Sequence, residues 1–138
     1  MRFMVIVKAS KDTEAGVMPS EAMLTEMGKF NEEMVKAGVM LAGEGLHPSS
    51  KGARIHFGTD GVSVTDGPFP ATGELACGFW LIQTGSRDEA IAWMKRAPFD
   101  AGSQLELRQV FEAEDFGEAL TPELRAQEER LRAQGTKR

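Results

Sequence analysis

Three polar side chains stand in otherwise apolar or conformationally stiff stretches of the sequence: Glu44, His47 and Asp66. Glu44 lies between two glycines in the apolar run 39–48, and His47 follows it by three residues. Asp66 comes directly before a glycine and a proline. A histidine and carboxylates that converge on a cleft can exchange protons near neutral pH. The spacing therefore predicts an acid/base site with Glu44, His47 and Asp66 as its catalytic residues.

The tetrapeptide Asp66-Gly67-Pro68-Phe69 has two interpretations, and the sequence leaves both open. In the first it only turns the chain, because Asp before Gly favours an Asx-turn and Pro68 fixes its own φ angle. In the second it lines a ligand cleft, with Pro68 and Phe69 as binding residues and Arg54 joining them from a neighbouring hairpin.

Each polar candidate also has a purely structural interpretation. Glu44 can hydrogen-bond to local backbone, His47 can be a polar strand end, and His56 is typical of an exposed hairpin residue. The chain has no H-x-x-x-H, H-x-E or cysteine-pair motif, so neither a metal nor a cofactor is predicted. Its single cysteine, Cys77, is expected to be a small residue within a buried strand.

Composition restricts the class of protein. The 138 residues suit one domain, and 16 basic against 21 acidic residues give a net charge of −5. An acidic chain without a basic stripe argues against nucleic acid as a partner. No stretch approaches the about 18 apolar residues of a membrane span, and no signal-peptide h-region opens the chain. These features predict a cytoplasmic protein that has no membrane partner.

Hydrophobic periodicity predicts the elements that position these residues. Alternating or doubly apolar runs predict strands at 2–9, 39–48, 54–57, 62–65, 74–84 and 104–111. Helical spacing and cap residues predict helices at 20–37, 86–97 and 121–133, and residues 10–18 are expected to form a polar loop. The Asp60-Gly61 pair predicts a tight hairpin between the third and fourth strands.

This order predicts an α+β fold, a ferredoxin-like sandwich with an inserted β-hairpin and an extra C-terminal helix. Strands 2–9 and 74–84 are apolar on both faces, although helices cover only one face in such a sandwich. A second subunit over the other face, and hence a homodimer, is the preferred explanation. The alternative is that the hairpin or the C-terminal helix folds back over it. The predicted domains are 1–116 and a helical extension, 117–138.

The blocks "AGVMLAGEGLHP" at 37–48 and "VTDGPFPATGELACGFWLI" at 64–82 resemble the YCII-related family, in particular its DGPF branch. The resemblance covers residues 2–111 and implies a ferredoxin-like fold whose dimer forms an α/β barrel. It also implies a His–Asp catalytic pair on the first helix in some members. Here the matching helix has no histidine, the histidine position falls near Met27, and Glu32, Glu33 and Lys36 stand near its end.

The preferred function is therefore small-molecule binding in a cleft, with acid/base chemistry left open, and the sequence does not decide whether the chain is an enzyme. One alternative is a non-enzymatic regulatory or interaction protein linked to an extracytoplasmic-function sigma factor, because members of the branch are often encoded beside such factors. The other is a dehydrochlorinase- or isomerase-like enzyme that acts on small aromatics or lactones. The absent His–Asp pair weighs against the last.

Overall fold

The computed structural model describes residues 1–70 and 72–135. Its strands are β1 (Arg2–Lys8), β2 (Met40–Gly45), β3 (Ala53–Gly58), β4 (Gly61–Asp66), β5 (Ala76–Gln83) and β6 (Leu105–Gln109). Its α-helices are α1 (Lys11–Glu14), α2 (Glu21–Lys36), α3 (Arg87–Met94) and α4 (Pro122–Gly135), and short 3-10 helices are η1 (Ser49–Lys51), η2 (Thr72–Glu74) and η3 (Ala113–Ala119). No helix among these residues is long and apolar enough to cross a membrane.

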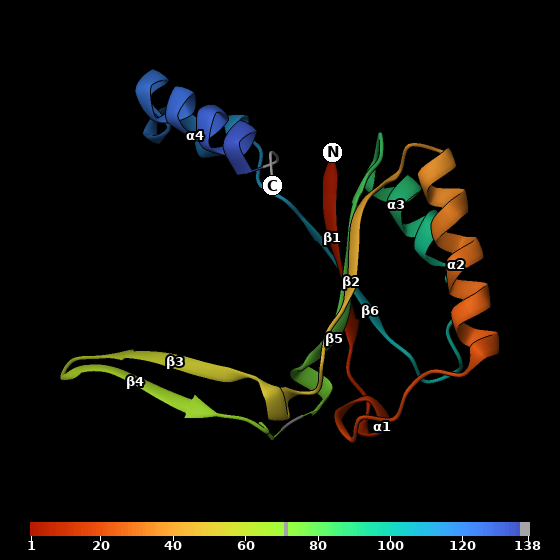
Figure 1. Ribbon diagram of the computed structural model, residues 1–138. Helices are drawn as coiled ribbons and strands as arrows, with labels where there is room; N and C mark the ends of the chain where they lie inside the picture. The colour runs from red at the N-terminus through yellow and green to blue at the C-terminus, as the bar shows by residue number, and fades with distance from the viewer. Residues whose placement is uncertain (71, 136–138) are drawn as a thin grey trace.

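The main sheet has four antiparallel strands in the order β2-β5-β1-β6. With β3 and β4 set aside, this is the strand order of a βαββαβ ferredoxin-like sandwich, so the predicted fold class is confirmed. Strands β3 and β4 pair only with each other and form the predicted hairpin. Figure 1 shows this hairpin projecting away from the main sheet.

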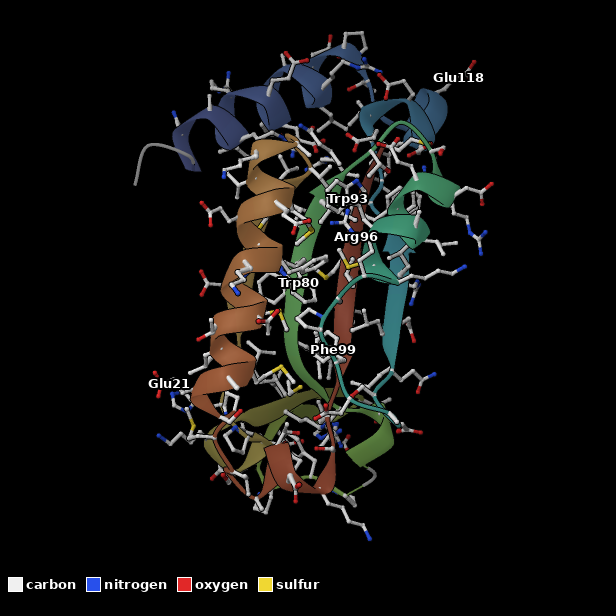
Figure 2. All side chains as sticks on the ribbon, turned by 90° about the vertical axis from the view of Figure 1, so that its right-hand side faces the viewer. Glu21, Trp80, Trp93, Arg96, Phe99 and Glu118 are labelled. Atoms are coloured by element: carbon white, nitrogen blue, oxygen red, sulfur yellow. The ribbon has the colours of Figure 1, made fainter. Side chains whose placement is uncertain are left out.

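Helices α2 and α3 cover one face of the main sheet (Figure 1). Helix α2 begins at its N-cap Ser20, whose hydroxyl accepts a hydrogen bond from the Met23 N–H, and buries Phe30 and Met34. The core that it forms with the sheet contains Phe3, Val5, Phe30, Met34, Val39, Trp80, Ile82, Ala90 and Met94. Figure 2 looks onto this side of the molecule, with Trp80 and Phe99 lying between the two helices.

The opposite face of the main sheet, called here the open face, carries two cross-strand rows of side chains. One row runs Glu44, Phe79, Ile6, Glu106, and the next runs Ala42, Leu81, Met4, Arg108. Directly opposed residues point to the same face, so apolar side chains form the middle of both rows. Met4 is 38% exposed and Phe79 is half-buried, so neither the hairpin nor α4 covers the middle of this face.

Residues 10–18, predicted to be a loop, contain the short helix α1. A reciprocal capping box explains it: Ser10 Oγ accepts from the Thr13 N–H, and Thr13 Oγ1 accepts from the Ser10 N–H at 2.8 Å. A helix of one turn has no apolar periodicity, so periodicity could not reveal it.

The predicted C-terminal helix is present as α4, which starts after Thr121, whose hydroxyl accepts from the Leu124 N–H at 3.2 Å. Helix α4 buries none of its residues. In Figure 1 it extends on the open-face side of the sheet, at the end where β1 begins, while the hairpin extends on the same side at the other end.

Candidate functional site

The Asp66–Phe69 loop leaves the hairpin at the end of β4 and is held by neighbouring backbone. The Gly67 N–H donates to the carbonyl oxygen of Gly52 at 2.9 Å, and the Phe69 N–H donates to Ser49 Oγ at 3.0 Å. The Gly67–Pro68 peptide bond is cis. The loop is therefore pinned to the η1 turn on either side of the proline.

Gly67 is required by space. A Cβ at this position would lie 1.7 Å from the carbonyl oxygen of Ser49, which is far inside van der Waals contact. Because the obstructing atom belongs to the backbone, no side-chain rotation can relieve the overlap. The glycine of the tetrapeptide thus lets the loop lie directly against η1.

Glu14 of α1 holds the other side of Ser49. Its carboxylate accepts hydrogen bonds from the Ser49 N–H at 2.9 Å and from Ser49 Oγ at 2.5 Å. These two donors, the hydroxyl first, lower the pKa of Glu14 below its ordinary 4.5. Ser49 therefore connects α1 to the Asp66–Phe69 loop through one hydroxyl that donates to Glu14 and accepts from Phe69.

Arg54, from β3, stacks on this loop. Its guanidinium carbon lies 4.1 Å from the centroid of the Phe69 ring, which is a cation–π contact. The two predicted ligand-binding residues Arg54 and Phe69 thus contact each other. Pro68 precedes Phe69 and is exposed.

The three predicted catalytic residues occupy different places. Glu44 lies on the open face in β2, opposite Phe79, while His47 is exposed in the segment after β2. Asp66 is exposed at the end of β4. In the part of the chain that the structure describes, no hydrogen bond or ion pair joins these side chains to one another, and the Asp66 carboxylate makes no hydrogen bond to its own turn.

The glycines around Glu44 have a packing role on the helix-covered side. A Cβ at Gly43 would lie 2.7 Å from Trp80 Cδ1, so the glycine makes room for the indole. The indole N–H in turn donates to Asn31 Oδ1 of α2 at 2.9 Å. With Gly43 facing the core, the alternation of the strand places Glu44 on the open face.

The two carboxylates at the ends of the Glu44–Glu106 row differ in their partners. Glu106 pairs with Lys8 at 3.2 Å and with Arg108 at 3.4 Å, and the hydrogen bonds from Lys8 and then Arg108 lower the pKa of Glu106. Glu44 has no ion pair or hydrogen bond from its carboxylate to any described residue. It is an uncompensated carboxylate beside apolar side chains.

Cys77, near the start of β5 on the same face, is half-buried, whereas a small buried residue was predicted. Its thiol lies 3.6 Å from the carbonyl oxygen of Lys8. Burial raises the pKa of Cys77, although a hydrogen bond with Thr13 opposes this effect. The side chain is therefore a thiol at neutral pH and a poor nucleophile. Among residues 1–70 and 72–135, no group of three or more His, Cys, Asp or Glu side chains is arranged to hold a metal ion.

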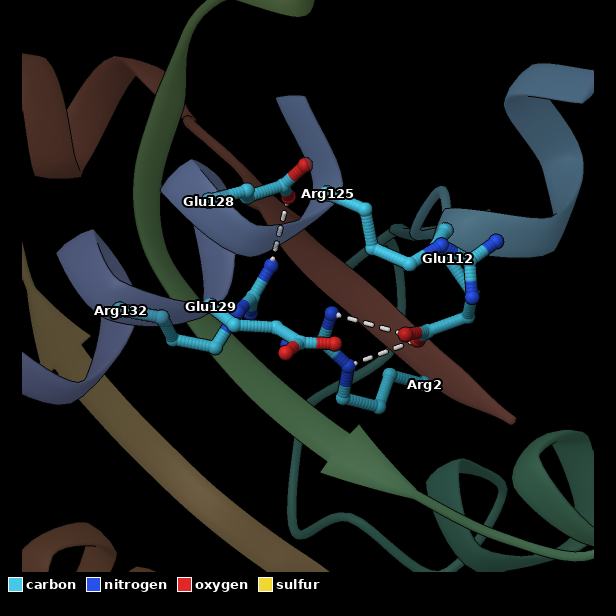
Figure 3. A pocket seen from close by; sticks show the side chains of 7 residues that line it. Arg2, Glu112, Arg125, Glu128, Glu129 and Arg132 are labelled. Atoms are coloured by element: carbon cyan, nitrogen blue, oxygen red, sulfur yellow. Dashed lines mark hydrogen bonds and ion pairs between the residues drawn. The ribbon is translucent and has the colours of Figure 1, made fainter. Parts of the chain in front are cut away.

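A separate polar cavity of about 360 Å³ lies at the other end of β1 (Figure 3). Its lining residues are Arg2, Glu112, Ala113, Arg125, Glu128, Glu129 and Arg132. Arg2 forms a two-bond ion pair with Glu112, at 2.7 and 3.2 Å, and its hydrogen bond lowers the pKa of Glu112. Arg132 pairs with Glu128 at 3.1 Å along α4. This cavity contains none of the predicted site residues.

Comparison with known proteins identifies the family. A sequence model of the YCII-related domain matches residues 1–114. The chain belongs to the YCII-related family. No curated protein matches it.

Among solved structures, this YCII-related chain resembles the 5-chloro-2-hydroxyhydroquinone dehydrochlorinase of Burkholderia phenoliruptrix, determined in complex with 2,5-dihydroxybenzoquinone. The sequence identity is 15% and the TM-score 0.43, with 83% of this chain and 99% of that chain covered. A similarity this distant does not transfer the activity of that enzyme to the YCII-related chain.

Sequence reasoning missed the residues that organise the site of this YCII-related chain. Glu14 and Ser49 are separated by 35 positions, and Arg2 and Glu112 by 110. No local pattern links partners so far apart. The only signals were the Ser10–Thr13 capping pattern, which indicates where α1 begins, and the Glu128–Arg132 spacing on α4.

Proposed function

We propose that this YCII-related chain acts as a homodimer that binds a small molecule in a cleft bordered by the open face and the Asp66–Phe69 loop. The observation that carries the proposal is Glu44, an unpaired carboxylate beside the apolar row Phe79–Ile6. A carboxylate removed from water without a partner is strongly unfavourable. If a second copy covers the open face, a ligand must therefore satisfy Glu44, or the partner chain must.

The open face supports a second copy as the cover. Its central side chains are apolar, and each Å² removed from water contributes about 25 cal/mol. The charged residues Glu106, Lys8 and Arg108 lie at one side and already compensate one another. An interface commonly has an apolar centre that is surrounded by polar or charged residues.

In this proposal, residues 1–116 form the ligand-binding domain and 117–138 a helical extension. Glu44 is the acid/base candidate, with His47 and Asp66 at the margin of the cleft. Pro68, Phe69 and Arg54 line it, and Arg54 keeps Phe69 in place through the stacking contact. Membership of the DGPF branch is part of the proposal, because the chain carries the Asp66-Gly67-Pro68-Phe69 tetrapeptide for which the branch is named.

A thermal-shift screen of small metabolites tests the ligand, with wild type, Glu44→Gln and Asp66→Ala compared side by side. A ligand at 100 times its dissociation constant should stabilise wild type by about 2.7 kcal/mol. The shift should shrink in Glu44→Gln and remain in Glu26→Gln, a matched change at an exposed position of α2. If no compound in the screen shifts wild type, or the shift is equal in all variants, the ligand site at Glu44 is wrong.

A regulatory or interaction protein is the second candidate, and one observation favours it. The β3–β4 hairpin exposes large apolar side chains, with Phe57 83% exposed. Exposed apolar patches commonly mark protein contacts. A wild type that binds no metabolite but requires this hairpin for a partner would favour this candidate over the cleft.

A further inference from the structure

The hairpin, residues 53–66 and called here the hairpin arm, has one apolar face that no described residue covers. Ile55 opposes Val64 and Phe57 opposes Val62 across the two strands, so all four side chains share a face. They are 59%, 62%, 83% and 63% exposed, respectively. A two-stranded hairpin is marginally stable by itself in water. This apolar face therefore calls for a partner.

Residues 111–135, called here the C-terminal arm, also expose large apolar side chains. Phe111, Phe116, Leu124 and Leu131 are 67%, 46%, 47% and 56% exposed. The rings of Phe111 and Phe116 lie 5.1 Å apart, so their apolar surfaces are contiguous. The ion pair between Glu112 and Arg2 holds this arm to the body.

The two arms project on the same side of the sheet but from opposite ends of it (Figure 1). The C-terminal arm lies at the Arg2 end of β1, and the hairpin arm lies near its Lys8 end. These ends are separated by the length of a seven-residue strand, about 23 Å. The open face lies between them.

We propose that, in the homodimer, the hairpin arm of each copy packs on the C-terminal arm of the other. This inference rests on the homodimer proposed above and adds its symmetry. If two open faces meet around a two-fold axis that runs across the strands, the ends of the copies are exchanged. Each hairpin arm then meets the partner's C-terminal arm, and both uncovered apolar surfaces are buried.

The distribution of charge disfavours a dimer whose two-fold axis runs along the strands. Such an axis would place the C-terminal arm of one copy on the C-terminal arm of the other, and the hairpin arm of one copy on the hairpin arm of the other. Residues 111–135 contain seven carboxylates and three arginines, a net charge of −4, whereas residues 53–66 carry one arginine and two carboxylates, a net charge of −1. Placing −4 on −4 is more repulsive than placing −4 on −1, so exchanging the arms lowers the repulsion.

The area required by a stable dimer points the same way. Four strands spaced about 4.8 Å apart and about 20 Å long give an open face of about 380 Å², half of the usual 800 Å² per partner. A hairpin arm adds a face of about 20 by 10 Å. In a two-fold interface each copy buries its own arm and the surface that receives the partner's arm. The open face, the arm and the surface that receives the partner's arm together amount to about 780 Å² per copy, close to the usual area.

Crosslinking of mixed chains tests the exchange. All chains carry Cys77→Ser, one tagged chain adds Phe57→Cys, and one untagged chain adds Leu124→Cys. After mixing and re-equilibration, a short bis-maleimide should join tagged to untagged chains at least tenfold more than in the control pair Ser63→Cys and Leu124→Cys, because Ser63 faces the other side of the hairpin. Crosslinking of Phe57→Cys chains to themselves, or no excess over the control, overturns the exchange.

A second measurement separates this inference from the homodimer itself. Phe57→Ser/Val62→Ser alters only exposed side chains and should raise the dimer dissociation constant at least tenfold, measured by sedimentation. An unchanged constant overturns the arm exchange while the homodimer and its ligand site stand. A monomeric wild type overturns the homodimer and the exchange together.

Discussion

At the scale of single residues, Ser49 is the position where three separate segments meet. Its hydroxyl donates to Glu14 of α1 and accepts from Phe69 of the loop, while its carbonyl oxygen packs against Gly67. The stiffness of Asp66–Phe69 therefore comes from what surrounds the loop as much as from Pro68. Asp66 is exposed, and its carboxylate takes no part in this network of described residues.

Gly67→Ala should destabilise the protein by about 2–3 kcal/mol or more, because the new Cβ would overlap the Ser49 carbonyl oxygen. Gly73→Ala, a nearby glycine whose Cβ would meet nothing within 4 Å, should change stability by about 0.5 kcal/mol at most. Urea unfolding of both variants measures the difference. Equal stabilities would show that the loop does not lie against η1 as described.

Glu14→Gln should lower stability most at neutral pH. The folded pKa of Glu14 lies below 4.5, so its contribution is complete above pH 4.5 and is lost as pH falls through the folded value. The stability gap between wild type and Glu14→Gln should therefore shrink between pH 7 and about pH 3. Urea unfolding at both pH values measures it, with Glu26→Gln as the control. A gap that grows on acidification would contradict the assigned hydrogen bonds.

Sequence patterns predicted which face of a strand a residue occupies, but not which partners hold a loop. Strand 74–84 was predicted to be apolar on both faces, and strand alternation places Trp80 of this strand on the helix-covered side, where it is 5% exposed. An Asx-turn at Asp66 was one of the two interpretations of the tetrapeptide, and in the structure the Gly52 carbonyl oxygen and Ser49 Oγ hold the loop. Partners supplied from distant segments cannot be deduced from local chemistry.

At the scale of elements, the C-terminal arm shows how a weakly buried helix is positioned by charge. Helix α4 buries no residue, and the Arg2–Glu112 ion pair fixes the segment that leads into it. The start of α4 was predictable from Thr121-Pro122-Glu123, since caps are local signals. Its direction was not, because it depends on an arginine at the opposite end of the chain.

A double-mutant cycle of Arg2→Gln and Glu112→Gln should give a coupling energy of about 1 kcal/mol at low salt. The side chains are 21% and 38% exposed, so the coupling should weaken in 1 M salt, where the screening length falls to about 3 Å. The exposed pair Glu26–Lys29, at 59% and 66%, should give almost none. Equal coupling in the two pairs would mean that Arg2 does not anchor the arm.

At the scale of the whole molecule, the main feature is the open face, the side of the sheet that α2 and α3 leave uncovered (Figure 1). Periodicity alone predicted that β1 and β5 are apolar on both faces, and the strand order β2-β5-β1-β6 confirms the ferredoxin-like sandwich that leaves one face free. The direction in which the hairpin projects was not predictable. Strands β3 and β4 pair only with each other, and the sequence pattern does not show how such a pair is oriented relative to the main sheet. The elements were therefore more predictable than their arrangement around the site.

Met4→Glu should convert the proposed dimer to a monomer without unfolding the chain. Met4 is 38% exposed in the middle of the open face, so the charge is tolerated in the single chain but would be buried in the dimer. Leu24→Glu, at a 57% exposed position on α2, should leave the mass unchanged. Light scattering at micromolar concentration distinguishes the two, and a dimeric Met4→Glu would place the interface elsewhere.

Trp80 has an optical consequence. The chain has two tryptophans and no tyrosine, and Trp80 packs edge-on against Phe30 and Phe99 on the helix-covered side. Trp93 lies in α3 on the same side, under the Arg96 guanidinium (Figure 2). Ultraviolet emission thus reports the helix-covered side with no tyrosine background, and a quencher that needs direct contact cannot reach either indole from the open face. Tryptophan fluorescence can therefore follow the loss of this packing during unfolding.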